Sequence, residues 1–289
     1  MSGDEAKSLA PGLYFVATPI GNARDITLRA LDVLAAADVL AAEDTRNTRR
    51  LMEIHGVPLN GRRLIPYHDH NAGRQRPKLI AMLKEGLSLA CVSDAGTPLI
   101  ADPGYGLARS AIDAGLPVSA VPGASAPLAA LSVAGLPTDR FTFAGFPPPK
   151  KAARRKALEG LAHSPGTLVL FESPRRVREL LEDLVAVLGA NRKAALCREL
   201  TKKFEQVRRG TLAELAAGCD DDPPKGEIVL LIAPPEARAA STAEIDAALS
   251  AALSGGGSLR DAVDAVAADL GAPRRAVYAR ALKRGKTGG

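Results

Sequence analysis

The chain has 289 residues, which is long enough for two domains that each bury a core, and 46% of its residues are hydrophobic but only 3% are aromatic. The polar first ten residues and the lack of an apolar run of about 18 residues argue against a signal peptide and a membrane-spanning segment. The net charge is +6. The absence of Trp and the presence of only four Tyr argue against an aromatic platform for stacked bases, and three cysteines suggest a reducing cytoplasm rather than a disulfide framework.

The first part of the chain alternates between strand and helix patterns. The predicted strands are Leu13–Ala17, Val39–Glu43, Leu64–Tyr67, Leu87–Val92 and Val118–Val121, and the predicted helices are Leu28–Ala37, Thr45–His55, Ala72–Glu85 and Tyr105–Ala114. Such alternation is typical of a mostly parallel sheet covered by helices on both faces. We therefore expect a first α/β domain over residues 1–122.

A second set of elements follows Pro122-Gly123. Its predicted strands are Arg140–Phe146, Thr167–Glu172, Ala194–Glu199 and Glu227–Ile232, its predicted helices are Ala126–Val133, Lys151–Leu161 and Pro174–Leu188, and Val207–Leu215 reads as a strand, a turn and a helix. These elements predict a second α/β domain over residues 123–235.

The remaining residues, 236–289, contain only helical patterns. Three helices are expected at Thr242–Leu253, Leu259–Leu270 and Arg274–Lys283, with Ser258 and Asp261 at an N-cap. Three short helices, the last one basic, resemble a helix-turn-helix module. The alternative is a helical cap that packs on the second domain.

The most informative segment is the loop after the strand Leu87–Val92. It runs from Ser93 to Gly104 and contains glycines that allow close backbone approach and prolines that stiffen it. In an open α/β sheet, such a strand-end loop is where a ligand binds. The spacing needed for a dinucleotide fingerprint or a P-loop is missing, so a compact ligand without phosphates is favoured.

Seven short blocks occur in an order that resembles a known family. They are Ala17-Thr-Pro-Ile-Gly-Asn22, Ala42-Glu-Asp-Thr-Arg46, Ser93-Asp-Ala-Gly-Thr-Pro98, Val121-Pro-Gly-Ala-Ser-Ala126, Phe171-Glu-Ser-Pro174, Arg198-Glu-Leu-Thr-Lys202 and Lys225-Gly-Glu-Ile228. Together they resemble the tetrapyrrole methylase superfamily and, within it, the ribosomal RNA small subunit methyltransferase I family. The first loop, Thr18–Asn22, and the segment Ala95–Pro98 depart from the porphyrin-type members and match the ribosomal RNA branch.

The resemblance implies an α/β fold with a two-domain tetrapyrrole-methylase-like architecture and a small helical C-terminal module. It also implies a cytoplasmic homodimer that uses S-adenosyl-L-methionine to methylate a cytidine 2′-hydroxyl of 16S rRNA, near the decoding centre and within the small ribosomal subunit. Two alternatives stay open: a C-methyltransferase that acts on a tetrapyrrole precursor, and a non-catalytic RNA-binding assembly factor that keeps the cofactor pocket.

By the same resemblance, the cofactor lies between the two α/β domains. The residues implied to contact it are Ile20, Gly21, Ala95, Gly96, Thr97, Ile100, Ser125, Ala126, Phe171, Glu172, Leu200, Glu227 and Ile228. For Ile20, Ile100, Phe171 and Leu200 the alternative is that the side chain simply belongs to a core.

A ribose hydroxyl is a weak nucleophile at neutral pH, so a positioned base or a hydrogen-bond acceptor should assist its attack. The candidates at strand ends and in the loop are Glu43, Asp44, Asp102 and Glu199, and the sequence does not select among them. Asp44 could instead cap the helix that follows it. A metal is not expected, because His68 and His70 have no cysteine or carboxylate cluster to complete a tetrahedral site.

Positive charge is concentrated outside the first domain. Residues 1–122 contain 13 basic and 13 acidic residues, whereas residues 123–235 contain 17 and 13. This imbalance favours a polyanionic partner, although each basic cluster alone could be a solvated helix face. The candidate RNA-binding residues are Arg46, Lys150, Lys151, Arg154, Arg155, Lys202, Arg274 and Arg275.

Overall fold

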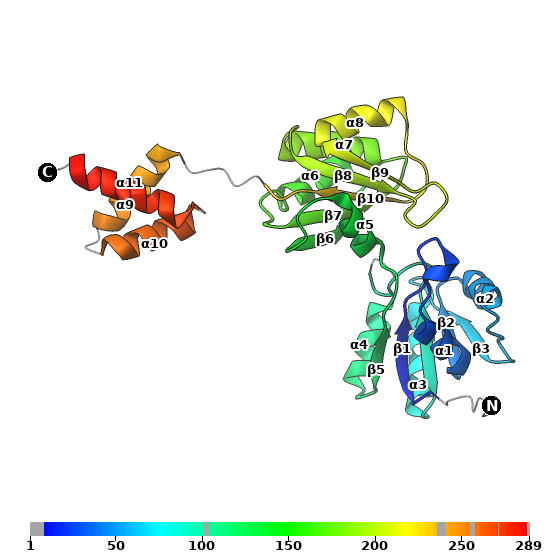
Figure 1. Cartoon of the computed structure of the whole chain (residues 1–289). Helices are drawn as coiled ribbons and strands as arrows, with labels where there is room; N and C mark the ends of the chain where they lie inside the picture. Colours follow the sequence, from blue (N-terminus) through cyan, green and yellow to red (C-terminus); the bar gives the residue numbers. More distant parts are fainter. Residues whose placement is uncertain (1–8, 101–103, 236–240, 255–257, 271, 288–289) are drawn as a thin grey trace, which may run out of the picture. The chain divides into compact units, whose positions relative to one another are not determined.

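The computed structural model describes residues 9–100, 104–235, 241–254, 258–270 and 272–287, so the candidate base Asp102 lies outside the described residues. The chain divides into two compact units, residues 1–234 and residues 235–289 (Figure 1). Among the described residues, no helix combines the length and the apolar character needed to cross a membrane.

The first sheet contains five parallel strands in the order β3-β2-β4-β1-β5, as the alternation of strands and helices predicts. The strands are β1 (Gly12–Val16), β2 (Val39–Ala42), β3 (Arg63–Pro66), β4 (Ser88–Val92) and β5 (Val118–Val121). A 3-10 helix, η1 (Ala23–Asp25), and the helices α1 (Leu28–Ala36), α2 (Thr45–Ile54), α3 (Ala72–Lys84) and α4 (Tyr105–Asp113) connect them.

Helices cover both faces of this sheet because the side chains of its central strand alternate between two cores. On β4, Leu89 and Cys91 pack with residues of α3 and α4, whereas Ala90 and Val92 pack with residues of α1 and with Met52 of α2. All five residues of β4 are buried, as is typical of a strand inside a parallel sheet. The helices α2 and α3 therefore lie on opposite faces.

The second sheet is mixed, with the order β6-β7-β10-β8-β9. Its strands are β6 (Phe141–Gly145), β7 (Thr167–Glu172), β8 (Lys193–Arg198), β9 (Gln206–Thr211) and β10 (Ile228–Ile232). Its helices are α5 (Ala126–Ala134), α6 (Lys151–Glu159), α7 (Val177–Leu188) and α8 (Leu212–Asp221). Only β6 and β7 pair in parallel, and β10 runs antiparallel to both of its neighbours. Helix α5 packs on one face, and α6, α7 and α8 share the other.

One predicted helix start is wrong. Helix α7 begins at Val177 rather than at Pro174, because the carbonyl of Ser173 accepts hydrogen bonds from the amides of both Arg176 and Val177 and so forms a turn before the helix. The turn leaves Pro174 and its neighbours as a loop at the end of β7.

A buried ion cluster joins α6 to α7 and overturns the prediction that Arg154 binds RNA. The Arg154 side chain is 2% exposed, and its guanidinium lies 2.8 Å from the carboxylate of Asp183 and 3.3 Å from that of Glu179. Arg155 donates to the other oxygen of Asp183 at 2.6 Å. Burial alone would raise the pKa of Asp183, but the hydrogen bonds from Arg155 and Arg154 outweigh it and lower the pKa.

The C-terminal unit has a core of its own. Its helices are α9 (Thr242–Ser254), α10 (Leu259–Asp269) and α11 (Arg274–Thr287). Ile245, Leu249, Val263, Val266, Val277 and Ala281 pack together at its centre. Ser258 caps α10 by accepting from the amide of Asp261, as the sequence predicts. An independent core means that the helices of this unit stabilise one another.

Candidate functional site

The ends of β1 and β4 are joined by a short backbone bridge between Thr18 and Gly96. The amide of Thr18 donates to the carbonyl of Gly96 at 2.9 Å, and the amide of Gly96 donates back at 3.0 Å. The Ser93 hydroxyl donates to the same Gly96 carbonyl at 2.8 Å. Gly96 has φ +86°, a left-handed conformation that favours glycine. The bridge therefore fixes the two strand-end loops against each other at the carboxyl edge of the first sheet.

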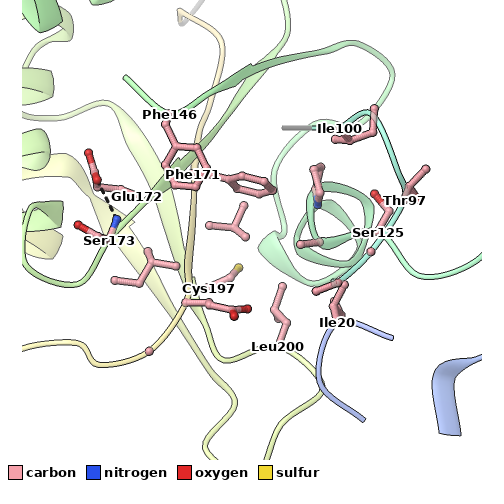
Figure 2. A pocket seen from close by; sticks show the side chains of 18 of the residues that line it. Ile20, Thr97, Ile100, Ser125, Phe146, Phe171, Glu172, Ser173, Cys197 and Leu200 are labelled. Atoms are coloured by element: carbon pink, nitrogen blue, oxygen red, sulfur yellow. Dashed lines mark hydrogen bonds between the residues drawn. The ribbon is translucent and has the colours of Figure 1, made fainter. Parts of the chain in front are cut away.

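A cavity of about 420 Å³ lies beside this bridge, between the ends of strands from both sheets (Figure 2). Its lining consists of Ile20, Ala95, Gly96, Thr97, Ile100, Ser125, Ala126, Pro127, Phe146, Phe171, Glu172, Ser173, Pro174, Cys197, Leu200, Gly226, Glu227, Ile228 and Val229. Apolar side chains dominate, with a few hydroxyl, carboxyl and backbone groups among them. This composition is typical of a small-molecule site.

Two aromatic rings form one wall of the cavity. Phe146 and Phe171 meet edge to face with ring centroids 5.4 Å apart, and Phe143 meets Phe171 in the same way with ring centroids 4.9 Å apart. In Figure 2 the rings of Phe146 and Phe171 lie across the cavity from Ile100 and Thr97. A flat ligand ring could pack against this wall.

An ion pair with a buried carboxylate anchors the segment that carries Phe146. Glu172 is 3% exposed, and its Oε2 lies 2.9 Å from Nη2 of Arg176, while its Oε1 accepts from the amide of Ser173. Arg176 also donates to the carbonyl of Pro147 at 3.0 Å. Glu172 therefore holds, through Arg176, the loop that places Phe146 at the cavity.

The sequence-based candidates for cofactor contact agree closely with this lining. Twelve of the 13 line the cavity, and the exception is Gly21. A Cβ atom at Gly21 would lie 2.4 Å from Cγ of Lys202, so this glycine allows the first loop to pack against the loop after β8.

Seven lining residues were not predicted: Pro127, Phe146, Ser173, Pro174, Cys197, Gly226 and Val229. Cys197 and Val229 are register partners on β8 and β10, so their side chains share one face of the sheet. Strand alternation could have placed them on one face, but it does not reveal which face borders the cavity.

Among the described residues, the predicted catalytic carboxylates Glu43, Asp44 and Glu199 do not line this cavity. Asp44 is the N-cap of α2, where it accepts from the amide of Arg46 at 2.8 Å, and its carboxylate also pairs with the Arg46 guanidinium. Hydrogen bonds from the Arg46 side chain and backbone lower the pKa of Asp44 to about 2. A carboxylate with so low a pKa is a poor base.

Glu199 is bound within the loop that follows β8. Its Oε1 accepts from the amide of Glu227 at 2.9 Å and from Nζ of Lys202 at 2.9 Å. The Glu227 amide and Lys202 together outweigh burial and lower the pKa of Glu199. Lys202 also lies 3.2 Å from Oε2 of Glu227, so this candidate RNA-binding residue bridges two carboxylates at the cavity rim.

Glu43 differs from the other two carboxylates. It follows β2 directly, and burial together with the charge of the neighbouring Asp94 raises its pKa. A raised pKa brings a carboxylate closer to the range in which general bases operate. Glu43 is therefore the one described candidate whose pKa is raised rather than lowered.

The other predicted RNA contacts fall into two groups. All five are exposed, and the first group consists of Lys150, Lys151 and Arg275. In the second group, Arg46 forms an ion pair with Asp44 and Arg274 forms one with Asp264.

No group of three potential metal ligands occurs among the described residues.

Comparisons with known proteins agree with this architecture. The family described as Tetrapyrrole (Corrin/Porphyrin) Methylases matches residues 12–216, and the RsmI C-terminal HTH domain matches residues 239–285. The chain is 51% identical over 285 residues to ribosomal RNA small subunit methyltransferase I of Mesorhizobium japonicum. The matched region covers 98% of this chain and 96% of the relative. The protein of the same name from Escherichia coli O157:H7 is 49% identical to this chain, over 76% of this chain and 77% of the length of the relative.

A solved structure shows the same fold. Uroporphyrin-III C-methyltransferase from Thermus thermophilus, complexed with S-adenosylhomocysteine, matches with a TM-score of 0.52 at 20% identity, over 76% of this chain and 96% of that one. This match, the family matches and the two sheets confirm the predicted fold class. The chain belongs to the ribosomal RNA small subunit methyltransferase I family, a branch of the tetrapyrrole methylases.

Proposed function

We propose that this protein transfers a methyl group from S-adenosyl-L-methionine to the 2′-hydroxyl of a cytidine in 16S rRNA of the small ribosomal subunit. The observation that carries the proposal is the high identity, along nearly the whole chain, to relatives named for ribosomal RNA. The tetrapyrrole enzyme shares the fold at much lower identity. Bacterial ribosomal RNA is cytoplasmic, so we place the activity in the cytoplasm.

The cavity beside the Thr18–Gly96 bridge fits the proposed cofactor. Its volume of about 420 Å³ lies in the range of small-molecule sites, about 300–1,000 Å³. Backbone around Gly96 would contact the nucleoside part, and Phe171 with Phe146 would pack against its flat ring. The bound cofactor supplies an activated methyl group, so the chain's main contribution is to position the acceptor and exclude water.

We assign the general base to Glu43, and this assignment gives the first prediction. Glu43→Gln should lower kcat by about 10²- to 10⁴-fold, because the amide cannot accept the proton of the ribose hydroxyl. The affinities for cofactor and RNA should stay near those of the unchanged protein. Single-turnover methyl transfer measures the rate, and calorimetry measures the affinity for the cofactor.

The pH profile provides a second readout for Glu43. Only the ionised carboxylate accepts a proton, and its pKa is raised, so kcat should decline as the pH falls through that raised pKa. Asp44→Asn is the matched control, since Asn also caps helices well and the low pKa of Asp44 already excludes it as a base. A wild-type rate in Glu43→Gln would refute the assignment.

We propose that the C-terminal unit holds RNA. Ending the chain at Pro235 should weaken binding to 16S rRNA or small subunits and leave cofactor affinity unchanged, because every cavity residue precedes that point. The salt dependence of RNA binding should become shallower as phosphate contacts are lost. A salt titration and a melting curve on the truncated protein test this. Unchanged RNA affinity in a well-folded truncation would exclude the role.

We also propose a homodimer, as the family resemblance implies. Tyr105 and Ile112 lie seven residues apart on α4, so they share one helix face, and they are 69% and 62% exposed. Exposed apolar groups on one face suit a permanent interface between copies. Light scattering should give about twice the chain mass of 30.0 kDa. A mass near that of one chain at micromolar concentration would contradict the dimer.

Transfer of tritium from labelled cofactor tests the whole proposal. Purified small subunits that lack the modification, naked 16S rRNA and uroporphyrinogen serve as three acceptors. Label in the RNA ribose supports the proposed reaction, and label in uroporphyrinogen alone favours the tetrapyrrole alternative. RNA binding without any transfer would favour a non-catalytic assembly factor.

A further inference from the structure

A second cavity, of about 180 Å³, lies under helix α2 at the carboxyl edge of the first sheet. It is lined by Thr18, Pro19, Gly21, Ala23, Asn47, Thr48, Arg50, Leu51, Ile54, Val92, Ser93 and Asp94. Thr18 borders this cavity, while its bridge partner Gly96 borders the larger one. The Thr18–Gly96 bridge thus separates two distinct cavities.

The smaller cavity contains a buried polar atom with no partner. Thr48 is 2% exposed, and its hydroxyl makes no hydrogen bond in the described part of the chain. A buried hydroxyl without a partner is costly, so such atoms are usually satisfied by water or by a ligand. Asp94, also in the lining, is held by the amide of Asp44 at 2.9 Å and by the Asn47 side chain at 3.1 Å. The lining therefore includes a buried hydroxyl without a partner and a carboxylate that is fixed in place.

A cleft rich in arginine adjoins it. This cleft of about 250 Å³ is lined by Thr45, Arg46, Arg49, Arg50 and Glu53, so Arg50 borders both spaces. Arg46 is paired with Asp44, but no ion pair in the described ranges includes Arg49 or Arg50, and both are exposed. A guanidinium group binds phosphate through two parallel hydrogen bonds. The two free guanidinium groups give α2 a phosphate-binding face.

We propose that the two spaces form one nucleotide subsite for the RNA strand. A single ring, base or ribose, occupies the smaller cavity, the Thr48 side chain turns its hydroxyl toward that ring, and the phosphate lies on Arg49 and Arg50. A volume of about 180 Å³ is below the range of whole-cofactor sites but admits one ring. The subsite rests on the proposed function, because it presupposes an RNA substrate. It assigns RNA contact to the first domain, in which basic and acidic residues are equal in number.

The phosphate half is tested with the full chain carrying Arg49→Ala and Arg50→Ala. Affinity for small subunits or 16S rRNA should fall about tenfold or more, and the slope of log affinity against log salt should decrease by up to about two. Lys78→Ala with Lys84→Ala removes the same charge from exposed positions of α3, on the opposite face of the sheet, and should change neither quantity. Equal losses in both double variants would overturn the subsite.

The ring half is tested with Thr48→Val, which keeps the shape of the side chain and removes its hydroxyl. The KM for RNA should rise about three- to tenfold, and the melting temperature should stay the same or rise, because an unsatisfied buried group has been removed. An unchanged KM would mean that the hydroxyl binds only water and would overturn this half. If Thr48→Val unfolds, Thr48→Ser, which keeps the hydroxyl, should retain the wild-type KM, and a raised KM in that variant would overturn it.

Cofactor binding separates failure of the subsite from failure of the proposed function. All of these variants should bind S-adenosyl-L-methionine with unchanged affinity, since none of the substituted residues lines the larger cavity. If the unchanged protein methylates small subunits and the arginine variant does so with the same KM, only the subsite is wrong. If the unchanged protein methylates no RNA, the proposed function itself fails.

Discussion

Ala126→Phe is expected to weaken binding of S-adenosyl-L-methionine by about 10- to 100-fold and to stop methyl transfer at ordinary cofactor concentrations. Ala126 is the first residue of α5 and lines the larger cavity, so a phenyl ring there would occupy space that the ligand needs. The fold should tolerate the change, because the ring enters a cavity rather than a packed core. Calorimetry with the cofactor and a melting curve measure the two effects.

The control for this variant lies on the same helix. Leu128 is 53% exposed, so Leu128→Phe adds bulk on the solvent side of α5 and should leave cofactor affinity unchanged. Gly96 is a less suitable position, since its φ of +86° means that any side chain would distort the bridge to Thr18 as well as the cavity. Normal affinity in a folded Ala126→Phe protein would show that the cofactor binds elsewhere.

Arg154→Ala is expected to destabilise the first unit by about 3–5 kcal/mol, because it leaves Asp183 buried without one of its two arginines. Cofactor affinity should be retained while the protein is folded, because Arg154 does not line the larger cavity. Chemical denaturation gives the free energy of unfolding. RNA affinity measured well below the melting temperature should be unaffected, in contrast to what the basic sequence cluster suggests.

Arg155→Ala serves as the comparison, because the Arg155 side chain is 41% exposed and Arg154 still neutralises Asp183 in its absence. We expect a loss of at most about 1 kcal/mol in the free energy of unfolding.

The pKa of Asp183 is lowered in the folded protein, so the contribution of this carboxylate to stability is fully present above the unfolded pKa of about 3.9. That contribution is lost as the pH falls through the pKa of the folded state. The stability difference between Arg154→Ala and the unchanged protein should therefore shrink at strongly acidic pH. Equal stability of the two proteins at neutral pH would refute the role of this cluster.

The parallel sheet and the ligand loop could be predicted because their signals are local. The buried run ending at Val92 and the glycines and prolines after it indicate a strand followed by a binding loop wherever they occur. The second sheet was harder to predict, since its antiparallel order depends on how β10 enters between β7 and β8. No local pattern specifies that insertion.

The errors at the candidate site have a common physical cause. The cluster containing Arg154 looks like a solvated surface, yet Arg154 is four residues before Leu158 and so lies on the helix face that packs against α7. Phe146 and Gly226 come from loops, and their position at the cavity depends on tertiary contacts such as the Glu172–Arg176 ion pair. Which side of a helix is buried, and which loops meet, is decided by packing between distant segments.

Cys197 lies in the wall of a cavity that is proposed to contain a methylating agent, so the protein must avoid alkylating itself. A thiolate is a strong nucleophile toward such carbon centres, whereas a neutral thiol is not. Burial raises the pKa of Cys197 to about 11, which leaves roughly one molecule in ten thousand ionised at pH 7. The apolar surroundings of the second sheet thus keep this sulfur unreactive, and polar substitutions beside it, such as Val229→Thr, carry a risk of slow self-inactivation by the enzyme's own cofactor.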